Sequence, residues 1–115
     1  MLFGAEKVFL ATQAIDMRKS YQGLGVLAEE VLKQNLFSGY QFVFYNKRRD
    51  RLKILYWHMN GFCILQKRLE KGRFQNLTIG EGSSVEITAY QLQGLIQGIE
   101  WKQIPIPSTL SYTIL

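Results

Sequence analysis

The basic side chains of this sequence are concentrated in one segment. Nine of its 14 lysines and arginines, but only two acids, lie in the run NKRRDRLKILYWHMNGFCILQKRLEKGRF between Asn46 and Phe74. Cations that alternate with aromatic residues at strand spacing are typical of surfaces that bind a polyanion, and nucleic acid is the polyanion that we expect. The candidate phosphate contacts in this segment are Lys47, Arg48, Arg49, Arg51, Lys53, Lys67, Arg68, Lys71 and Arg73.

A second interpretation of this segment is a solvated hairpin whose charges protect a sheet edge from pairing. The convergence of cations from two neighbouring strands and their loop favours the binding interpretation. Phe42, Phe44 and Trp57 could stack on bases, as aromatic side chains do in proteins that bind single strands. We favour the alternative, in which these three aromatics belong to the hydrophobic core.

The sequence offers little for catalysis. His58 and Cys63 are expected to face each other across a hairpin, and a Cys–His pair can form an activated nucleophile. Both are predicted on a buried face without a third orienting group, and one His with one Cys cannot form a zinc site. A two-metal nuclease needs several convergent carboxylates. Only Asp50 and Glu70 lie near the basic strands, and Glu70 is better explained as a partner for Arg51. We therefore predict no catalytic residue, no metal and no cofactor.

These residues must be positioned by a small α+β domain, in which an antiparallel sheet packs against one long and one short helix. Apolar or alternating patterns predict strands at 7–11, 40–46, 51–59, 62–69 and 84–88. Asp16 is predicted to cap a helix over residues 17–34. The apolar stripe of that helix contains Tyr21, Leu24, Leu27, Ala28, Val31 and Leu32. Thr88 is predicted to cap a second helix that stops at Gly98.

The pair Asn60-Gly61 predicts a type I′ hairpin turn, because this turn needs positive φ at both central residues. The resulting register places Lys53 opposite Arg68 and Trp57 opposite Ile64. One face of the hairpin is mostly apolar, and we predict that the long helix covers it; its residues are Leu52, Ile54, Tyr56, Cys63, Leu65 and Leu69. The opposite face then presents Arg51, Lys53, Trp57, Gln66 and Arg68.

Length and composition indicate one domain over residues 1–115, in which residues of about 102–115 form an extended tail. A domain of this length buries roughly two-thirds of its unfolded surface and needs no disulfide. The sequence pI near 9.5 fits nucleic acid or an anionic membrane surface. No apolar run approaches the ~20 residues that span a bilayer, and the N-terminus lacks the pattern of a signal peptide. We therefore expect a cytoplasmic protein.

The sequence also resembles a known family. The residues that carry the resemblance are Asp16-Met17-Arg18-Lys19 with Gly23-Leu24, Phe42-Val43-Phe44 before Asn46-Lys47-Arg48-Arg49, Lys53-Ile54-Leu55 with Trp57, Gly61-Phe62, and Lys67-Arg68-Leu69-Glu70 with Gly72-Arg73-Phe74. They are similar to the second-open-reading-frame product, called TnpB there, of the insertion-sequence sixty-six family of bacterial transposons. The resemblance extends from about Lys7 to Trp101, and the sequence departs from the family pattern at Ser20, Gln22, Lys47 and His58.

Members of this family are encoded beside a larger transposase that carries an acidic catalytic triad, so the resemblance implies an accessory role in transposition. We add Arg18 and Lys19 to the candidate phosphate contacts. The expected partners are DNA at the transposon ends, the transposase and other products of the same element, and no membrane. Two functions remain open: DNA binding through the basic hairpin, or an adaptor that docks on the transposase without contacting DNA. We expect the protein at the nucleoid when it is bound to DNA.

Overall fold

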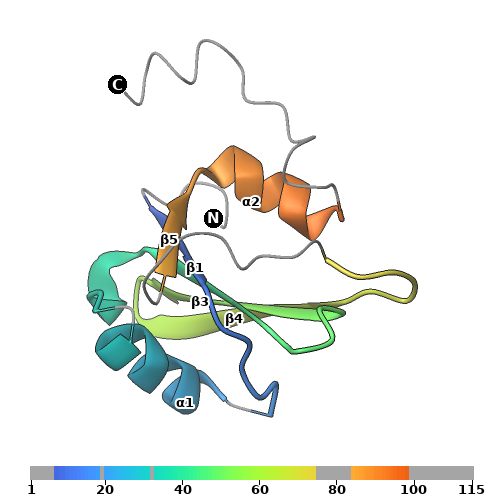
Figure 1. The fold of residues 1–115 in the computed structure, drawn as a ribbon. Helices are drawn as coiled ribbons and strands as arrows, with labels where there is room; N and C mark the ends of the chain where they lie inside the picture. Colours follow the sequence, from blue (N-terminus) through green and yellow to red (C-terminus); the bar gives the residue numbers. More distant parts are fainter. Residues whose placement is uncertain (1–6, 19, 32, 75–83, 99–115) are drawn as a thin grey trace.

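The centre of the molecule is a five-stranded sheet with the order β4-β3-β2-β1-β5 (Figure 1). The computed structural model describes residues 7–18, 20–31, 33–74 and 84–98. The strands are β1 (Val8–Ala11), β2 (Gln41–Tyr45), β3 (Arg51–His58), β4 (Gly61–Arg68) and β5 (Ser84–Ile87). β1 is parallel to β2, and the other neighbouring strands are antiparallel. The predicted α+β class is confirmed, with a sheet that is mixed and mostly antiparallel.

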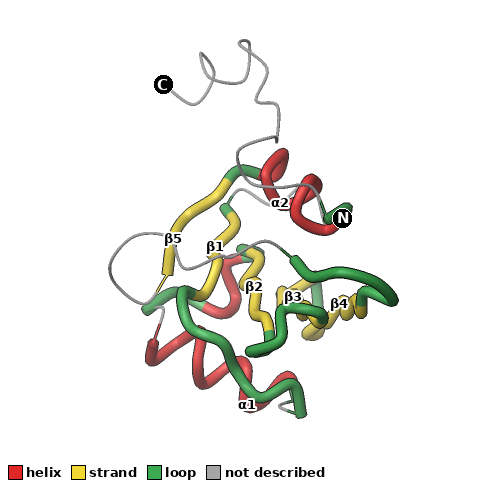
Figure 2. Tube along the Cα trace, turned by 45° about the vertical axis from the view of Figure 1, so that its right-hand side comes forward, coloured by secondary structure: helices red, strands yellow, loops and turns green. Residues whose placement is uncertain are grey.

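The helices lie on opposite faces of this sheet (Figures 1 and 2). On one face, α1 (Tyr21–Val26) continues into the π-helical turn η2 (Leu27–Val31), and the 3-10 turn η3 (Leu36–Ser38) leads into β2. On the other face lies α2 (Ala89–Ile96). None of the helices in the described ranges is long and apolar enough to cross a membrane.

The long helix begins later than predicted. Asp16 does not cap it, because its Oδ1 accepts a hydrogen bond from the Arg18 N–H at 2.9 Å and closes a local turn. The helix begins at Tyr21, after Ser20 in an extended conformation. An Asp side chain that bonds to its own neighbouring backbone offers the chain an alternative to the helix, and here the alternative is adopted.

The short helix agrees with the prediction at both ends. The Thr88 hydroxyl accepts from the Gln91 N–H at 3.0 Å, and the Gln91 side chain accepts from the Thr88 N–H at 2.9 Å. This reciprocal arrangement is a capping box, which satisfies two amides that the helix itself leaves unpaired. Gly98, with φ 80°, follows the last turn in the left-handed conformation that glycine adopts without strain.

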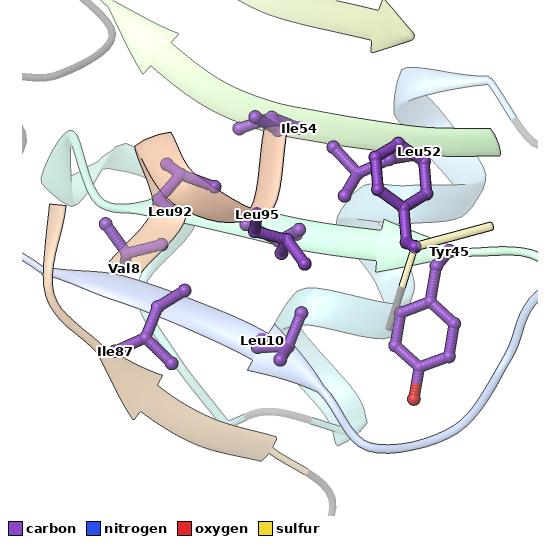
Figure 3. Packing of buried hydrophobic residues seen from close by; sticks show 10 residues of the cluster. Val8, Leu10, Tyr45, Leu52, Ile54, Ile87, Leu92 and Leu95 are labelled. Atoms are coloured by element: carbon purple, nitrogen blue, oxygen red, sulfur yellow. The ribbon is translucent and has the colours of Figure 1, made fainter. Parts of the chain in front are cut away.

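The prediction of which helix covers which face was wrong. The face of Leu52 and Ile54 packs against Leu92 and Leu95 of α2 (Figure 3). The long helix covers the opposite face, where Leu24, Leu27 and Ala28 pack with Phe9, Phe42, Phe44 and Leu55. The sequence pattern misled because the middle of the sheet is apolar on both faces. Phe42 and Phe44 are 0% and 1% exposed, so these two aromatics are core residues.

The hairpin register differs from the prediction by two residues. Met59 and Asn60 occupy the turn, and Met59, not Gly61, takes the positive φ of 56°. Lys53 lies opposite Gln66, and Arg51 lies opposite Arg68. A two-residue shift leaves every side chain on its predicted face, because side chains alternate with a period of two. In the observed register Trp57 faces Phe62, and the two rings meet edge-on with centroids 5.0 Å apart.

The core on the α2 side contains an unsatisfied polar atom. Tyr45 is 3% exposed, and its hydroxyl has no hydrogen-bond partner. Figure 3 shows this hydroxyl at the margin of the cluster, pointing away from Leu52. Burial raises the pKa of Tyr45, and the charge of Arg49 partly offsets the rise. A buried hydroxyl without a partner has lost its water without receiving a replacement.

Replacing Tyr45 with Phe is therefore expected to stabilise the fold. The substitution Tyr45→Phe keeps the ring and removes the unpaired group, so the free energy of unfolding should rise by about 1 kcal/mol. Tyr90→Phe is the matched control, because Tyr90 is 43% exposed. Its effect should stay within about 0.5 kcal/mol. Urea denaturation measures both variants, and a loss of stability in Tyr45→Phe would show that the hydroxyl has a bonding role.

Candidate nucleic-acid interface

Strand direction brings the conspicuous basic segments of the sequence to one end of the sheet. β1 and β2 are parallel, and β4 points the same way as β2 because both are antiparallel to β3. The segments that follow these three strands therefore emerge at one end, beside the start of β3. We call this region the basic end, and its described cations are Arg18, Lys47, Arg48, Arg49, Arg51, Arg68, Lys71 and Arg73.

Backbone hydrogen bonds hold the three segments together. The Ile15 N–H donates to the Tyr45 carbonyl at 2.9 Å, which ties the segment after β1 to the end of β2. The Phe74 N–H donates to the Arg49 carbonyl at 2.6 Å, which ties the segment after β4 to the β2–β3 turn. The cations therefore project from one connected piece of backbone and not from three independent loops.

Asn46 organises the β2–β3 turn, a role that our sequence analysis missed. Its Oδ1 accepts from the Asp50 N–H at 3.1 Å and the Arg51 N–H at 3.0 Å, and its Nδ2 donates to the Asp50 carboxylate at 2.7 Å. Arg49 takes φ 58° in this turn. Asn favours such turns because its side chain bonds to nearby backbone. An Asn four residues before an Asp, between two strands, was the signal available in the sequence.

A groove separates two of the basic segments. Its volume is about 440 Å³, and its lining residues lie at 14–17 on one wall and 46–48 on the other. Lys47 and Arg48 are exposed there. The Lys53 ammonium donates to the Met17 carbonyl at 2.6 Å and so fixes one wall of the groove to the sheet. The structure thus brings together two blocks that carried the family resemblance, at 16–18 and 46–49.

Arg18 and Asp16 form an ion pair beside this groove. The guanidinium Nη2 and Nε donate to the carboxylate at 2.6 and 3.0 Å. The hydrogen bonds and the attraction of Asp16 raise the pKa of Arg18 above its usual range, so the side chain stays charged. The Arg18 side chain is 91% exposed, which leaves its outer edge accessible to a second anion.

Two like charges are paired at the edge of the basic end. Arg51 and Arg68 lie directly opposite each other on β3 and β4. Within the described ranges neither forms an ion pair, and the predicted pairing of Glu70 with Arg51 is absent. Like charges in directly opposite positions destabilise a sheet. An anion bound between the two arginines would remove that repulsion.

Two of the lysines predicted as phosphate contacts bond to backbone carbonyls within the fold. Lys53 is 8% exposed and is occupied by the Met17 carbonyl. Lys67 lies on the α2 face and donates to the Ile96 carbonyl at 2.6 Å, where a cation complements the C-terminus of the helix. Both ammonium groups are therefore engaged within the fold, and we leave Lys53 and Lys67 out of the basic end. The prediction for Lys19 lies outside the described residues.

Contrary to the prediction, His58 and Cys63 do not face each other across the hairpin. Cys63 lies opposite Tyr56, and His58 lies opposite Gly61. Cys63 is half-buried and not fully buried. Partial burial is the main cause that raises the pKa of Tyr56, and the neighbouring Cys63 thiol raises it further. Over the described residues, no three His, Cys, Asp or Glu side chains are close enough together to hold a metal ion.

Comparison with known proteins finds a matching family model and similar proteins. The model of the family described as "IS66 Orf2 like protein" matches residues 6–105. The uncharacterised protein y4hO of Sinorhizobium fredii (strain NBRC 101917 / NGR234) is 36% identical over 96 residues, which are 84% of this chain and 83% of that protein. The uncharacterised protein y4jC of the same strain is 31% identical over 98 residues, 85% of this chain and 83% of that protein. No solved structure matches.

The Asn46–Asp50 contact predicts a pH dependence of stability. The hydrogen bond from Asn46 first, and then the charges of Arg48 and Arg51, lower the pKa of Asp50 below its ordinary 3.8. A carboxyl with a lowered pKa stabilises the fold above the unfolded-state pKa and loses this effect as pH falls through the folded-state value. Wild type should therefore be more stable than Asp50→Asn at about pH 7, and the difference should shrink as pH falls below about 4 and through the folded-state pKa.

Denaturant unfolding of both proteins across this pH range measures the difference. The amide of Asp50→Asn keeps an oxygen that accepts from Asn46, so the variant isolates the charge. Glu86→Gln removes an exposed carboxylate on β5, away from the basic end, and is the matched control. A wild-type advantage that is unchanged between neutral and acid pH would contradict the role of the Asp50 charge.

Proposed function

The chain belongs to the IS66 Orf2-like family of insertion-sequence proteins, and we propose that it is a non-catalytic accessory factor that binds DNA through the basic end. Membership of this family associates the chain with the transposition system of its element. The proposed DNA is the end of that element, and the proposed partners are the transposase and the other products of the element. Such a factor would work at the bacterial nucleoid.

The convergence of three cationic segments is the observation that carries this proposal. Eight described cations gather at the basic end with three carboxylates, those of Asp16, Asp50 and Glu70. Two of the three carboxylates are already engaged, Asp16 by Arg18 and Asp50 by Asn46. Most of the positive charge is therefore left for an external anion. A field of one sign on a connected surface attracts polyanions and accelerates their association.

The chemistry of the basic end suits phosphates rather than base edges. Its exposed side chains are Arg18, Lys47, Arg48, Arg68, Lys71 and Arg73. Contacts of Lys and Arg with phosphates fix the position of a protein on DNA without reading its sequence. The named cations of the basic end lie on strand ends and turns, and α2 packs on a face of the sheet. We therefore propose binding that depends strongly on salt and weakly on sequence.

The salt dependence of binding tests the proposal. If about five cations reach phosphates of a duplex, log K should fall by about 0.9 per contact for each log unit of salt. Raising salt from about 50 mM to about 200 mM should then weaken binding on the order of 10²- to 10³-fold. In the double variant Lys47→Gln/Arg48→Gln the magnitude of the slope of log K against log salt should decrease by up to about 1.8. Fluorescence anisotropy with a labelled random-sequence duplex measures both slopes.

The matched control removes two cations from the opposite end of β2. Lys7 and Lys33 are exposed; Lys7 precedes β1, whose start lies beside the start of β2, and Lys33 precedes β2 along the chain. The double variant Lys7→Gln/Lys33→Gln has the same net charge as Lys47→Gln/Arg48→Gln and should keep the wild-type slope. Equal slopes for the two double variants would mean that binding follows net charge alone, and the basic end would not be the site.

If DNA binding does not depend on salt, or if the protein does not bind DNA, the adaptor alternative is favoured. In that case the cations of the basic end would meet an acidic surface of the transposase, without contact between this chain and DNA. Co-purification of the two proteins, lost in Lys47→Gln/Arg48→Gln and kept in Lys7→Gln/Lys33→Gln, would then identify the basic end as the docking surface.

A further inference from the structure

The groove at the basic end differs in chemistry from the cationic surface around it. Ala14, Ile15 and Met17 make one of its walls largely apolar. Ile15 and Met17 are half-buried and pack against the hydrophobic core on the α1 face. The volume of about 440 Å³ lies within the range of pockets that hold small organic groups, roughly 300–1,000 Å³. Phosphate contacts use cations and not apolar walls, so they do not account for this groove.

Hydrogen bonds fix both walls of the groove. The Ile15 N–H donates to the Tyr45 carbonyl at 2.9 Å, and the Lys53 ammonium donates to the Met17 carbonyl at 2.6 Å. The Asn46 side chain accepts two backbone N–H groups of the turn that carries the other wall. The groove is therefore preformed, and a preformed site loses less conformational entropy when it binds a ligand.

The charges around the groove indicate its occupant. Lys47 and Arg48 are exposed on one wall. Asp16 lies on the other wall, where its carboxylate is paired with the Arg18 guanidinium at 2.6 Å, and the Arg18 side chain is 91% exposed. A complementary ligand therefore offers an uncharged group to the apolar wall and an anion on each side of that group. A nucleotide within a DNA strand has this pattern, because its base is uncharged and lies between two phosphates.

We propose that the groove receives an unpaired base of single-stranded DNA, while the cations on its two sides contact the flanking phosphates. This inference rests on the proposed function and adds a strand preference to it. In a duplex every base is paired and stacked, so a base enters a pocket only from a single strand or after it has been flipped out. The Asn46 amide is engaged within its own turn, so the groove reads the edge of the base weakly.

An abasic extension separates the effect of the base from that of its phosphates. The probes are a blunt duplex, the same duplex with a single-stranded extension of about four nucleotides, and the same extension built from abasic nucleotides. The abasic extension keeps every phosphate and lacks the bases. In fluorescence anisotropy at one salt concentration, wild type should bind the natural extension about fivefold or more tighter than the abasic one.

Filling the groove tests where the base is bound. Ala14→Leu places a larger side chain on the apolar wall and changes no charge, so it should abolish the advantage of the natural extension and keep the affinity for the blunt duplex. Gln13→Leu is the matched control, because Gln13 is exposed beside Ala14 and does not line the groove. This control should keep the full advantage. Circular dichroism melting confirms that both variants are folded.

Failure of this inference is distinguishable from failure of the proposed function. Equal wild-type affinities for the natural and abasic extensions would overturn the inference alone, if the blunt duplex still binds with the expected salt dependence. An advantage that survives in Ala14→Leu would also overturn it, because the base would then be bound elsewhere. Absence of binding to all the probes would overturn both proposals. Co-purification with the transposase that is lost only in Ala14→Leu, with DNA binding unchanged, would assign the groove to a protein partner instead.

Discussion

The parallel pairing of β1 with β2 is the constraint on which the rest of the structure depends. Val8, Phe9 and Leu10 pair with Gln41, Phe42 and Val43. Parallel neighbours cannot be joined by a tight turn and need a long crossover. Here the crossover contains α1, η2 and η3, and it covers one face of the sheet. Because the two strands point the same way, the segments that leave them emerge together at the basic end.

This constraint explains how a chain with scattered basic motifs produces one charged surface. The Asp16–Arg18 turn follows β1, the Asn46 turn follows β2, and the segment to Phe74 follows β4. Each is tied to another by a backbone or side-chain hydrogen bond, with Lys53 and Asn46 as the buried or half-buried connectors. The positive charge therefore sits on an ordered frame, which lowers the entropy lost when a ligand is bound.

The two ends of the hairpin differ in the side chains that they expose. At the end of the hairpin away from its turn, Arg68 lies opposite Arg51, and the repulsion between these like charges destabilises the fold. The half of the hairpin near its turn carries the apolar side chains Ile64 and Met59, which are exposed to water at a cost in free energy. A protein that keeps both features is organised around contacts outside itself.

The sequence by itself determined the elements. Apolar or alternating patterns identified the strands of the described sheet, and Thr88 identified the start of α2. Local chemistry decides these features, so local sequence reveals them. Only the tertiary structure decided the parallel β1–β2 pairing, the face covered by α1, the two-residue shift of the hairpin and the internal use of Lys53 and Lys67. Each depends on residues 29 or more positions apart, or on two alternative packings that local patterns leave nearly equal, and only the assembled core distinguishes them.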